Sequence, residues 1–225
     1  MKYLLILICF LSLVSCENSV NSTAFIEATQ GRYLFNSNEI IEVKFKSGQM
    51  LIKWRNQDLE PVRLTDSSFY LSKMNEKLIF VSKPKMHIEL APKREHKGKK
   101  FIFPKLKDGE KIPDEHFKDK AYEKALAGYI AIQKKDSLDQ NIRQRTLKTI
   151  GYSYLQKKQF EEAKEIFKIN IALYPKSSDV YYCMGNAYKA EKDTVKALEY
   201  FKKSLDINPE NRSSKRKLEQ LTKEE

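Results

Sequence analysis

The sequence predicts an α+β chain of more than one domain, in which a small antiparallel β barrel or sandwich precedes a domain built only of helices. Two observations predict this fold class. Apolar residues recur with a period of two between about residues 25 and 110, and with a period of 3.6 after about residue 113. The second part also repeats residue types at a spacing of 34 positions, which is typical of stacked helical hairpins.

The composition excludes several kinds of site. The chain has 225 residues, of which 41% are hydrophobic, and carries a formal charge of +12, so it can form one or two packed domains. It has three cysteines and three histidines: Cys9, Cys16, Cys183, His87, His96 and His116. These are too few for a disulfide framework or a structural zinc site, and we expect no metal and no cofactor.

Residues 1–15 have the features of an export signal. Lys2 precedes an apolar run over residues 3–14, which is shorter than the roughly 20 residues needed to span a bilayer. Leu13-Val14-Ser15-Cys16 resembles the lipobox of bacterial lipoproteins, in which the chain is cut before the cysteine and the cysteine is acylated. A plain secretory signal that happens to contain a cysteine is the alternative.

The lipobox implies a lipid-anchored (palmitoylated) protein of the cell envelope, attached to the membrane through Cys16. More than one acyl chain makes such anchoring stable. Glu17, in place of an aspartate, favours the outer membrane, on its periplasmic or surface face. Residues 16–24 are expected to form a polar tether.

Seven or eight short strands are predicted within a β-rich domain spanning residues 25–110, and no helix. The expected strands cover residues 39–45, 50–54, 62–64, 69–71, 78–81, 86–90 and 101–103. Ser47-Gly48 supplies the turn of a hairpin between the first two.

Parts of this region resemble a known family. Gly31-Arg32-Tyr33, Ile41-Glu42-Val43 and the run over residues 69–80 resemble the lipocalin-like β-domain that follows the catalytic domain of some penicillin-binding-protein-like (β-lactamase-like) serine hydrolases. The resemblance implies a second possible role, binding of a small apolar ligand. The side chains that would either line that interior or fill a core are Met50, Ile52, Trp54, Phe69, Leu71, Ile79 and Val81.

The helical domain is expected over residues 113–222. A first helix over residues 115–135, capped by Asp114, precedes repeats at about 144–177 and 178–211, and a capping helix covers residues 213–222. Residues that match at the 34-residue offset are Gly151 and Gly185, Tyr154 and Tyr188, Ala163 and Ala197, Phe167 and Phe201, and Pro175 and Pro209.

This pattern is similar to the tetratricopeptide repeat, a helix–turn–helix unit. Small residues stand where the two helices approach, and the prolines end the second helix of each unit. Asn170 departs from the pattern, because a small residue is expected there and Ser204 supplies it in the second unit. The stretch over residues 120–222 also resembles the repeat tail of the serine hydrolases named above, so the chain looks like their rear half without the catalytic domain.

The resemblance to tetratricopeptide repeats implies a concave groove, lined by the first helix of each unit, that binds a peptide or a partner protein. The residues expected in it are Arg145, Lys148, Tyr152 and Leu155 from the first unit, and Asp179, Tyr182, Asn186 and Lys189 from the second. Lys148 and Asn186 resemble parts of a clamp for a terminal carboxylate, in which charge-assisted hydrogen bonds favour an anionic group. A merely solvated groove is the alternative.

Catalytic motifs are poorly represented. Ser-x-x-Lys occurs at Ser82 and at Ser214, but the first holds a proline in a turn and the second lies in a basic helix, and neither has a Lys-Thr-Gly partner. His87 and Glu89 share a strand face without a third metal ligand in sight.

A dense basic stretch over residues 93–107 contains only one acidic residue, Glu95, before Asp108. It is interpreted as a solvated loop, with an anionic lipid or glycan surface as the alternative, and a nucleic-acid partner is not expected outside the cytoplasm. The sequence therefore predicts a non-enzymatic, membrane-anchored module for protein–protein interaction. The alternative from another class is the accessory half of a split serine hydrolase.

Overall fold

The computed structural model describes residues 21–224, which form two compact units. The first unit, called the β domain below, contains residues 21–34 and 40–107; the second, called the repeat domain, contains residues 35–39 and 108–224. The predicted signal peptide, the lipidation site Cys16 and most of the predicted tether lie outside the described residues.

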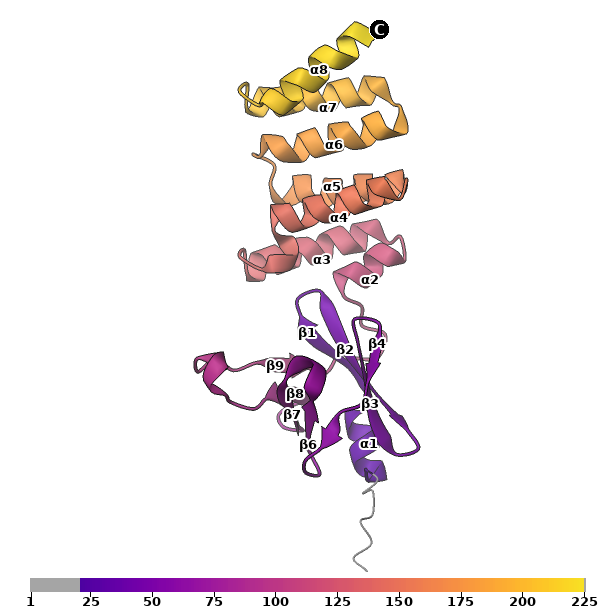
Figure 1. Cartoon of the computed structure of the whole chain (residues 1–225), viewed down its shortest axis with the longest axis vertical. Coiled ribbons are helices and arrows are strands. Elements are labelled where there is room, and N and C mark those ends of the chain that lie inside the picture. The colour runs from indigo at the N-terminus through magenta and orange to yellow at the C-terminus, as the bar shows by residue number, and fades with distance from the viewer. Residues whose placement is uncertain (1–20, 225) are drawn as a thin grey trace, which may run out of the picture. The chain divides into compact units, whose positions relative to one another are not determined.

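The β domain consists of one helix and two sheets (Figure 1). Its elements are α1 (Thr23–Thr29), β1 (Gly31–Asn36), β2 (Glu39–Lys46), β3 (Gln49–Trp54), β4 (Gln57–Leu59), β5 (Val62–Arg63), β6 (Ser68–Leu71), β7 (Glu76–Val81), β8 (His87–Leu90) and β9 (Ile102–Pro104). Strands β1 to β4 form one sheet and β5 to β9 the other, each in sequence order. An isolated antiparallel bridge between Tyr33 and Lys105 links the first sheet to the segment after β9. The predicted antiparallel β-rich region is confirmed.

Helix α1 was not predicted; most of it is exposed, but its Phe25 side chain packs against the aromatic core of this domain. The Ser22 hydroxyl caps it by accepting a hydrogen bond of 3.2 Å from the Phe25 amide. The Phe25 ring then packs 5.8 Å from the Phe69 ring and 5.6 Å from the Phe80 ring, measured between centroids. Asn21, placed in the tether by the sequence, is buried and bonded to the Gly48 carbonyl through both its amide groups. The folded domain therefore starts earlier than predicted.

Two strands also escaped prediction. In β1 only Tyr33 is fully buried, and β4 has three residues, so neither carries a full alternation of buried and exposed positions. The predicted inner face of β7 was wrong: Leu78 and Phe80 are buried, whereas Ile79 and Val81 lie on the opposite face. Because residues 78–81 are all apolar, alternation could not distinguish the two faces.

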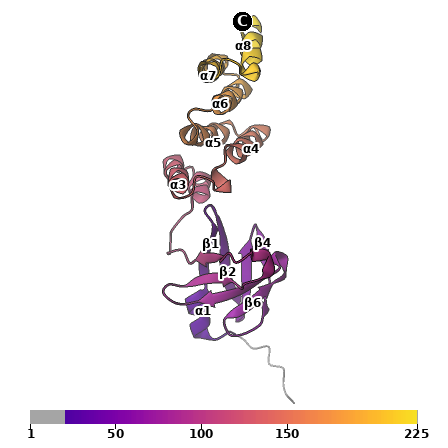
Figure 2. The same ribbon diagram turned by 90° about the vertical axis from the view of Figure 1, so that its left-hand side faces the viewer.

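The repeat domain contains only helices in its described part after residue 108 (Figure 2). They are α2 (Pro113–Lys118), α3 (Tyr122–Lys135), a short 3₁₀ turn η3 (Gln140–Ile142), α4 (Gln144–Gln156), α5 (Phe160–Leu173), α6 (Ser178–Glu191), α7 (Thr194–Ile207) and α8 (Arg212–Glu224). Figure 2 shows α3 to α8 as a staggered stack.

The single helix expected over residues 115–135 was wrong, because α2 and α3 are separate. Lys120 adopts a left-handed backbone conformation with φ of 59°, which breaks the helix. Asp114 is not the cap: it lies in the first turn of α2, which begins at Pro113, while the Glu115 carboxylate accepts a 3.0 Å hydrogen bond from the Ile112 amide. Proline suits this first position because it has no N–H to leave unpaired.

Candidate functional site

The candidate site lies on α4. Leu147 and Gly151 are the fully buried residues of this helix, and they face its partner α5. A Cβ atom added to Gly151 would overlap the Phe167 ring, so glycine is required where α4 and α5 meet. The face at the i, i+4 and i+8 positions from Gln144 is not covered by α5 and is partly exposed.

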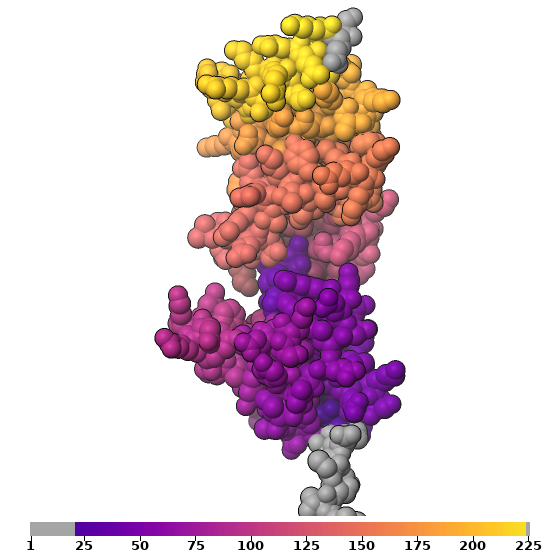
Figure 3. All heavy atoms as spheres, in the orientation of Figure 1, coloured from indigo at the N-terminus to yellow at the C-terminus, as the bar shows by residue number. Residues whose placement is uncertain are grey.

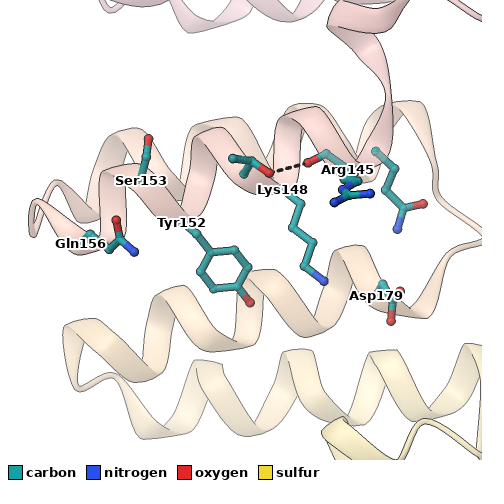
Figure 4. A pocket seen from close by; sticks show the side chains of 8 residues that line it. Arg145, Lys148, Tyr152, Ser153, Gln156 and Asp179 are labelled. Carbon is teal, nitrogen blue, oxygen red and sulfur yellow. Dashed lines mark hydrogen bonds between the residues drawn. The ribbon is translucent and has the colours of Figure 1, made fainter.

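A pocket of about 620 Å³ covers this open face. It is lined by Gln144, Arg145, Lys148, Thr149, Tyr152, Ser153 and Gln156 of α4, and by Asp179 near the start of α6. Figure 4 shows the Lys148 and Tyr152 side chains extending from α4 towards α6, with Asp179 at one end.

Tyr152 is held in place by its neighbours. Its hydroxyl accepts a 2.9 Å hydrogen bond from the Asn186 amide, and its ring packs edge-to-face 5.6 Å from the Phe167 ring. Burial raises the pKa of Tyr152 far above its usual value, so the phenol stays neutral at physiological pH. The side chain thus offers a fixed aromatic face and a neutral hydroxyl.

The remaining lining groups are charged or hydrogen-bonding. Arg145 and Lys148 place two positive charges beside the single negative charge of Asp179. The Thr149 hydroxyl donates to the Arg145 carbonyl at 3.0 Å, and the Ser153 hydroxyl donates to the Ile150 carbonyl at 2.7 Å. Both hydroxyls therefore present acceptor lone pairs to a bound molecule.

Four of the predicted groove residues line this pocket together, namely Arg145, Lys148, Tyr152 and Asp179. The other predicted residues lie elsewhere. Tyr182 packs 5.8 Å from the Phe201 ring, the Lys189 ammonium donates to Gln220 at 3.4 Å, and Leu155 joins an apolar cluster around Phe167. Asn186 is not among the residues that line the pocket, but its amide donates to the Tyr152 hydroxyl.

Sequence reasoning missed Gln144, Thr149, Ser153 and Gln156. Helical spacing was the signal that would have found them, because two adjacent rows of the helix recur at intervals of four residues: Gln144, Lys148, Tyr152 and Gln156, and Arg145, Thr149 and Ser153. The prediction took its residues from the repeat pattern and did not follow the whole face of the helix.

The lining contains no pairing typical of a nucleophile and its base. None of the eight lining residues is a histidine, cysteine or glutamate, and Ser153 already bonds to a backbone carbonyl. Within residues 21–224, no three metal-ligating side chains lie close enough to hold an ion. No helix in this same range is long and apolar enough to cross a membrane.

Comparison with known proteins identifies the helical hairpins. Two family models described as tetratricopeptide repeat match residues 147–174 and 178–211. A search of curated proteins returned no match.

Solved structures similar to the chain include three tetratricopeptide-repeat (TPR) domains. The first TPR of Spaghetti (RPAP3), bound to an HSP90 peptide, is 19% identical with a TM-score of 0.35, over 50% of this chain and 86% of that one. The Arabidopsis OM64 TPR domain is 18% identical with a TM-score of 0.35, over 50% of this chain and 90% of that one. The Sgt2 TPR domain from Aspergillus fumigatus is 22% identical with a TM-score of 0.35, over 50% of this chain and 73% of that one.

The helix boundaries agree with the family matches. Residues 147–174 take in most of α4 and all of α5, and residues 178–211 take in α6 and α7. Pro175 and Pro209 lie two residues after the ends of α5 and α7, where the sequence predicted that the second helix of each unit ends. The chain therefore carries two tetratricopeptide repeats, at residues 147–174 and 178–211.

Proposed function

We propose that this protein is a non-enzymatic, lipid-anchored module that binds a segment of a partner protein in the α4 pocket. The observation that carries the proposal is the open face of α4, where Arg145, Lys148 and Tyr152 converge with Asp179 on one pocket. Tetratricopeptide repeats build rigid stacked scaffolds, on which such a face is preorganised for docking.

The chemistry of the pocket favours a polar segment with an acidic group. Two cations oppose one carboxylate, so an acidic side chain near Arg145 and Lys148 gains charge-assisted hydrogen bonds. Asp179, at the end of the pocket in Figure 4, would favour a donor or a cation on the same segment. The fixed Tyr152 ring supplies the apolar contact between them.

Site-specific photo-cross-linking in cells tests this function. A photoreactive amino acid at Thr149, an exposed pocket residue, is expected to capture a discrete partner, and the same group at Lys202, an exposed residue of α7, is expected not to. Adding Lys148→Glu should abolish capture at Thr149, while Lys202→Glu should leave it intact. Capture that is unaffected by Lys148→Glu, or equal from both positions, would contradict the proposal.

The identity of the captured protein separates the two function classes. A serine hydrolase carrying its own Ser-x-x-Lys would favour the accessory half of a split enzyme, and any other partner the interaction module. Anchoring is tested separately by labelling with radioactive palmitate, which should mark the native chain and spare Cys16→Ser. Equal labelling of both chains would rule out Cys16 as the lipidation site.

A further inference from the structure

The loop between β8 and β9 carries the densest positive charge in the described part of the β domain. This basic loop, residues 91–101, contains five cations and one carboxylate: Lys93, Arg94, Lys97, Lys99, Lys100 and Glu95. Figures 1 and 3 show it protruding from the side of the two sheets. The protrusion is convex, in contrast to the pocket on α4.

The basic loop has a defined internal structure. Its first part is a 3₁₀ turn, η2 (Arg94–His96), which ends at Lys97 and Gly98, both with positive φ. Three backbone hydrogen bonds close it: the amides of His96, Lys97 and Lys99 donate to the carbonyls of Lys93, Arg94 and His96 at 2.9 to 3.1 Å. Its charges are therefore presented on a series of turns.

A largely shielded carboxylate fastens the loop to the sheet. Glu76, the first residue of β7, accepts from the Lys93 ammonium at 2.5 Å and from the His96 ring at 3.1 Å. The side chains of Glu76 and His96 are 12% and 8% exposed, so this contact is largely shielded from water. The His96 ring also packs 5.0 Å from the Phe101 ring.

This fastening neutralises Lys93 and leaves the other four cations unpaired. Arg94, Lys97, Lys99 and Lys100 are exposed, and no carboxylate of the described residues lies within ion-pair distance of them. Lys164 in the repeat domain shows the opposite arrangement, because Glu161 and Glu191 bracket it at 3.1 and 2.9 Å. Four uncompensated charges on one turn repel one another, so a folded loop of this kind is stabilised by an external anion.

Apolar surface lies beside these charges. Ile102, the first residue of β9, is 50% exposed. The neighbouring Phe101 ring is covered by Lys99, whose ammonium lies 5.4 Å from the ring centroid. Cations next to an exposed aliphatic side chain suit the boundary between lipid headgroups and acyl chains.

We infer that the basic loop docks on the surface of a bilayer that contains anionic lipids. Each Lys or Arg near such a surface contributes attraction, and a convex tip reaches a flat surface without rearrangement. A nucleic acid fits less well, because single strands need a groove with free aromatic faces and Phe101 is already packed between His96 and Lys99. This inference is independent of the function proposed for the α4 pocket.

Vesicle co-sedimentation tests the inference. The full chain carrying Cys16→Ser, which removes the predicted acylation site, is mixed with phosphatidylcholine vesicles with and without phosphatidylglycerol. The loop variant replaces Arg94, Lys97, Lys99 and Lys100 by glutamine. The matched control replaces Lys202, Lys215, Arg216 and Lys223, four exposed cations of α7 and α8, in the same way and has the same net charge.

We expect the parent and the control to bind anionic vesicles, and the loop variant to bind them at least about tenfold more weakly. Binding by the parent should fall as salt rises, since the Debye length is only about 10 Å at 0.1 M. Equal loss in the control and loop variants would overturn the inference, as would equal binding of the parent to neutral vesicles. Tighter binding of the parent to single-stranded or double-stranded DNA than to anionic vesicles at the same salt would also overturn it.

Discussion

Asn170 and Ser204 make the same hydrogen bond in two successive repeats. The Asn170 amide donates to the Gln144 carbonyl at 3.2 Å, and the Ser204 hydroxyl donates to the Ser178 carbonyl at 2.8 Å. Both side chains are completely buried, and each ties the second helix of a repeat to the first residue of its first helix. Asn170 therefore departs from the repeat pattern in size and keeps its bonding role.

We predict that Ser204→Ala lowers the free energy of unfolding by about 1 kcal/mol, because the Ser178 carbonyl loses a donor inside the domain. Ser214 also donates to the Ser204 hydroxyl at 2.7 Å, so part of the loss falls on α8. Urea denaturation followed by circular dichroism measures the change. Ser213→Ala, an exposed position of α8, is the control and should change stability by less than about 0.5 kcal/mol. Equal effects of the two substitutions would refute this role.

Each repeat depends on a glycine under an aromatic ring. A Cβ atom added to Gly185 would lie 2.6 Å from the Phe201 ring, and one added to Gly151 would overlap the Phe167 ring. We predict that Gly185→Ala destabilises the protein by about 1–3 kcal/mol, although alanine is the better helix former. Gly185→Ala should therefore cost less stability when it is made in a Phe201→Leu background than when it is made in the parent. Strictly additive effects in the double variant would show that the ring and the glycine do not compete for space.

The contact of Glu76 with Lys93 and His96 should depend on pH. Burial raises the pKa of Glu76, but the hydrogen bonds and charges of Lys93 and His96 outweigh this effect. The pKa of Glu76 is therefore below its usual 4.5. A group with a lowered folded-state pKa stabilises the protein above its unfolded-state pKa, and this contribution is lost as pH falls through the folded-state value. Stability should therefore fall below about pH 4.5.

Glu76→Gln provides the comparison. This variant should be less stable than the parent near neutral pH, and the difference should shrink between about pH 6 and about pH 3 in urea denaturation. Glu95→Gln is the matched control, since the Glu95 carboxylate is exposed on the same loop and has no ion-pair partner among the described residues. A difference between parent and Glu76→Gln that stays constant over this range would contradict the prediction.

Cys183 should be an inert thiol in the folded protein. It is 1% exposed, and burial raises the pKa of its thiol. The hydrogen bond with Tyr152 lowers that pKa, but by a smaller amount. In a chain carrying Cys9→Ser and Cys16→Ser, we expect iodoacetamide to react with Cys183 at least about tenfold more slowly in buffer than in urea. Comparable rates in both solvents would mean that the helices around Cys183 open readily. The Tyr152→Phe variant, which removes the hydroxyl, is expected to remain protected because burial dominates.

Prediction from sequence succeeded where the periodicity was unambiguous. The helix pairs of the two repeats were located from matched residues at one spacing. These residues match because each repeat packs a phenylalanine ring against a glycine, Phe167 against Gly151 and Phe201 against Gly185. It failed on β7, where residues 78–81 are apolar on both faces. It also failed at Lys120, whose left-handed backbone conformation separates α2 from α3. No glycine stands at this position to indicate such a break in the sequence.

The sequence by itself determined the order of the two domains, the presence of the repeats and the positively charged stretch after β8. These follow from local periodicity and composition, which can be recognised from the order of the residues alone. Only the tertiary structure decided which predicted groove residues share a pocket, because Arg145 and Asp179 are brought together by the packing of α4 beside α6. It also decided that Glu76 and His96, 20 positions apart, hold the basic loop to the sheet, since strand pairing sets which distant residues meet.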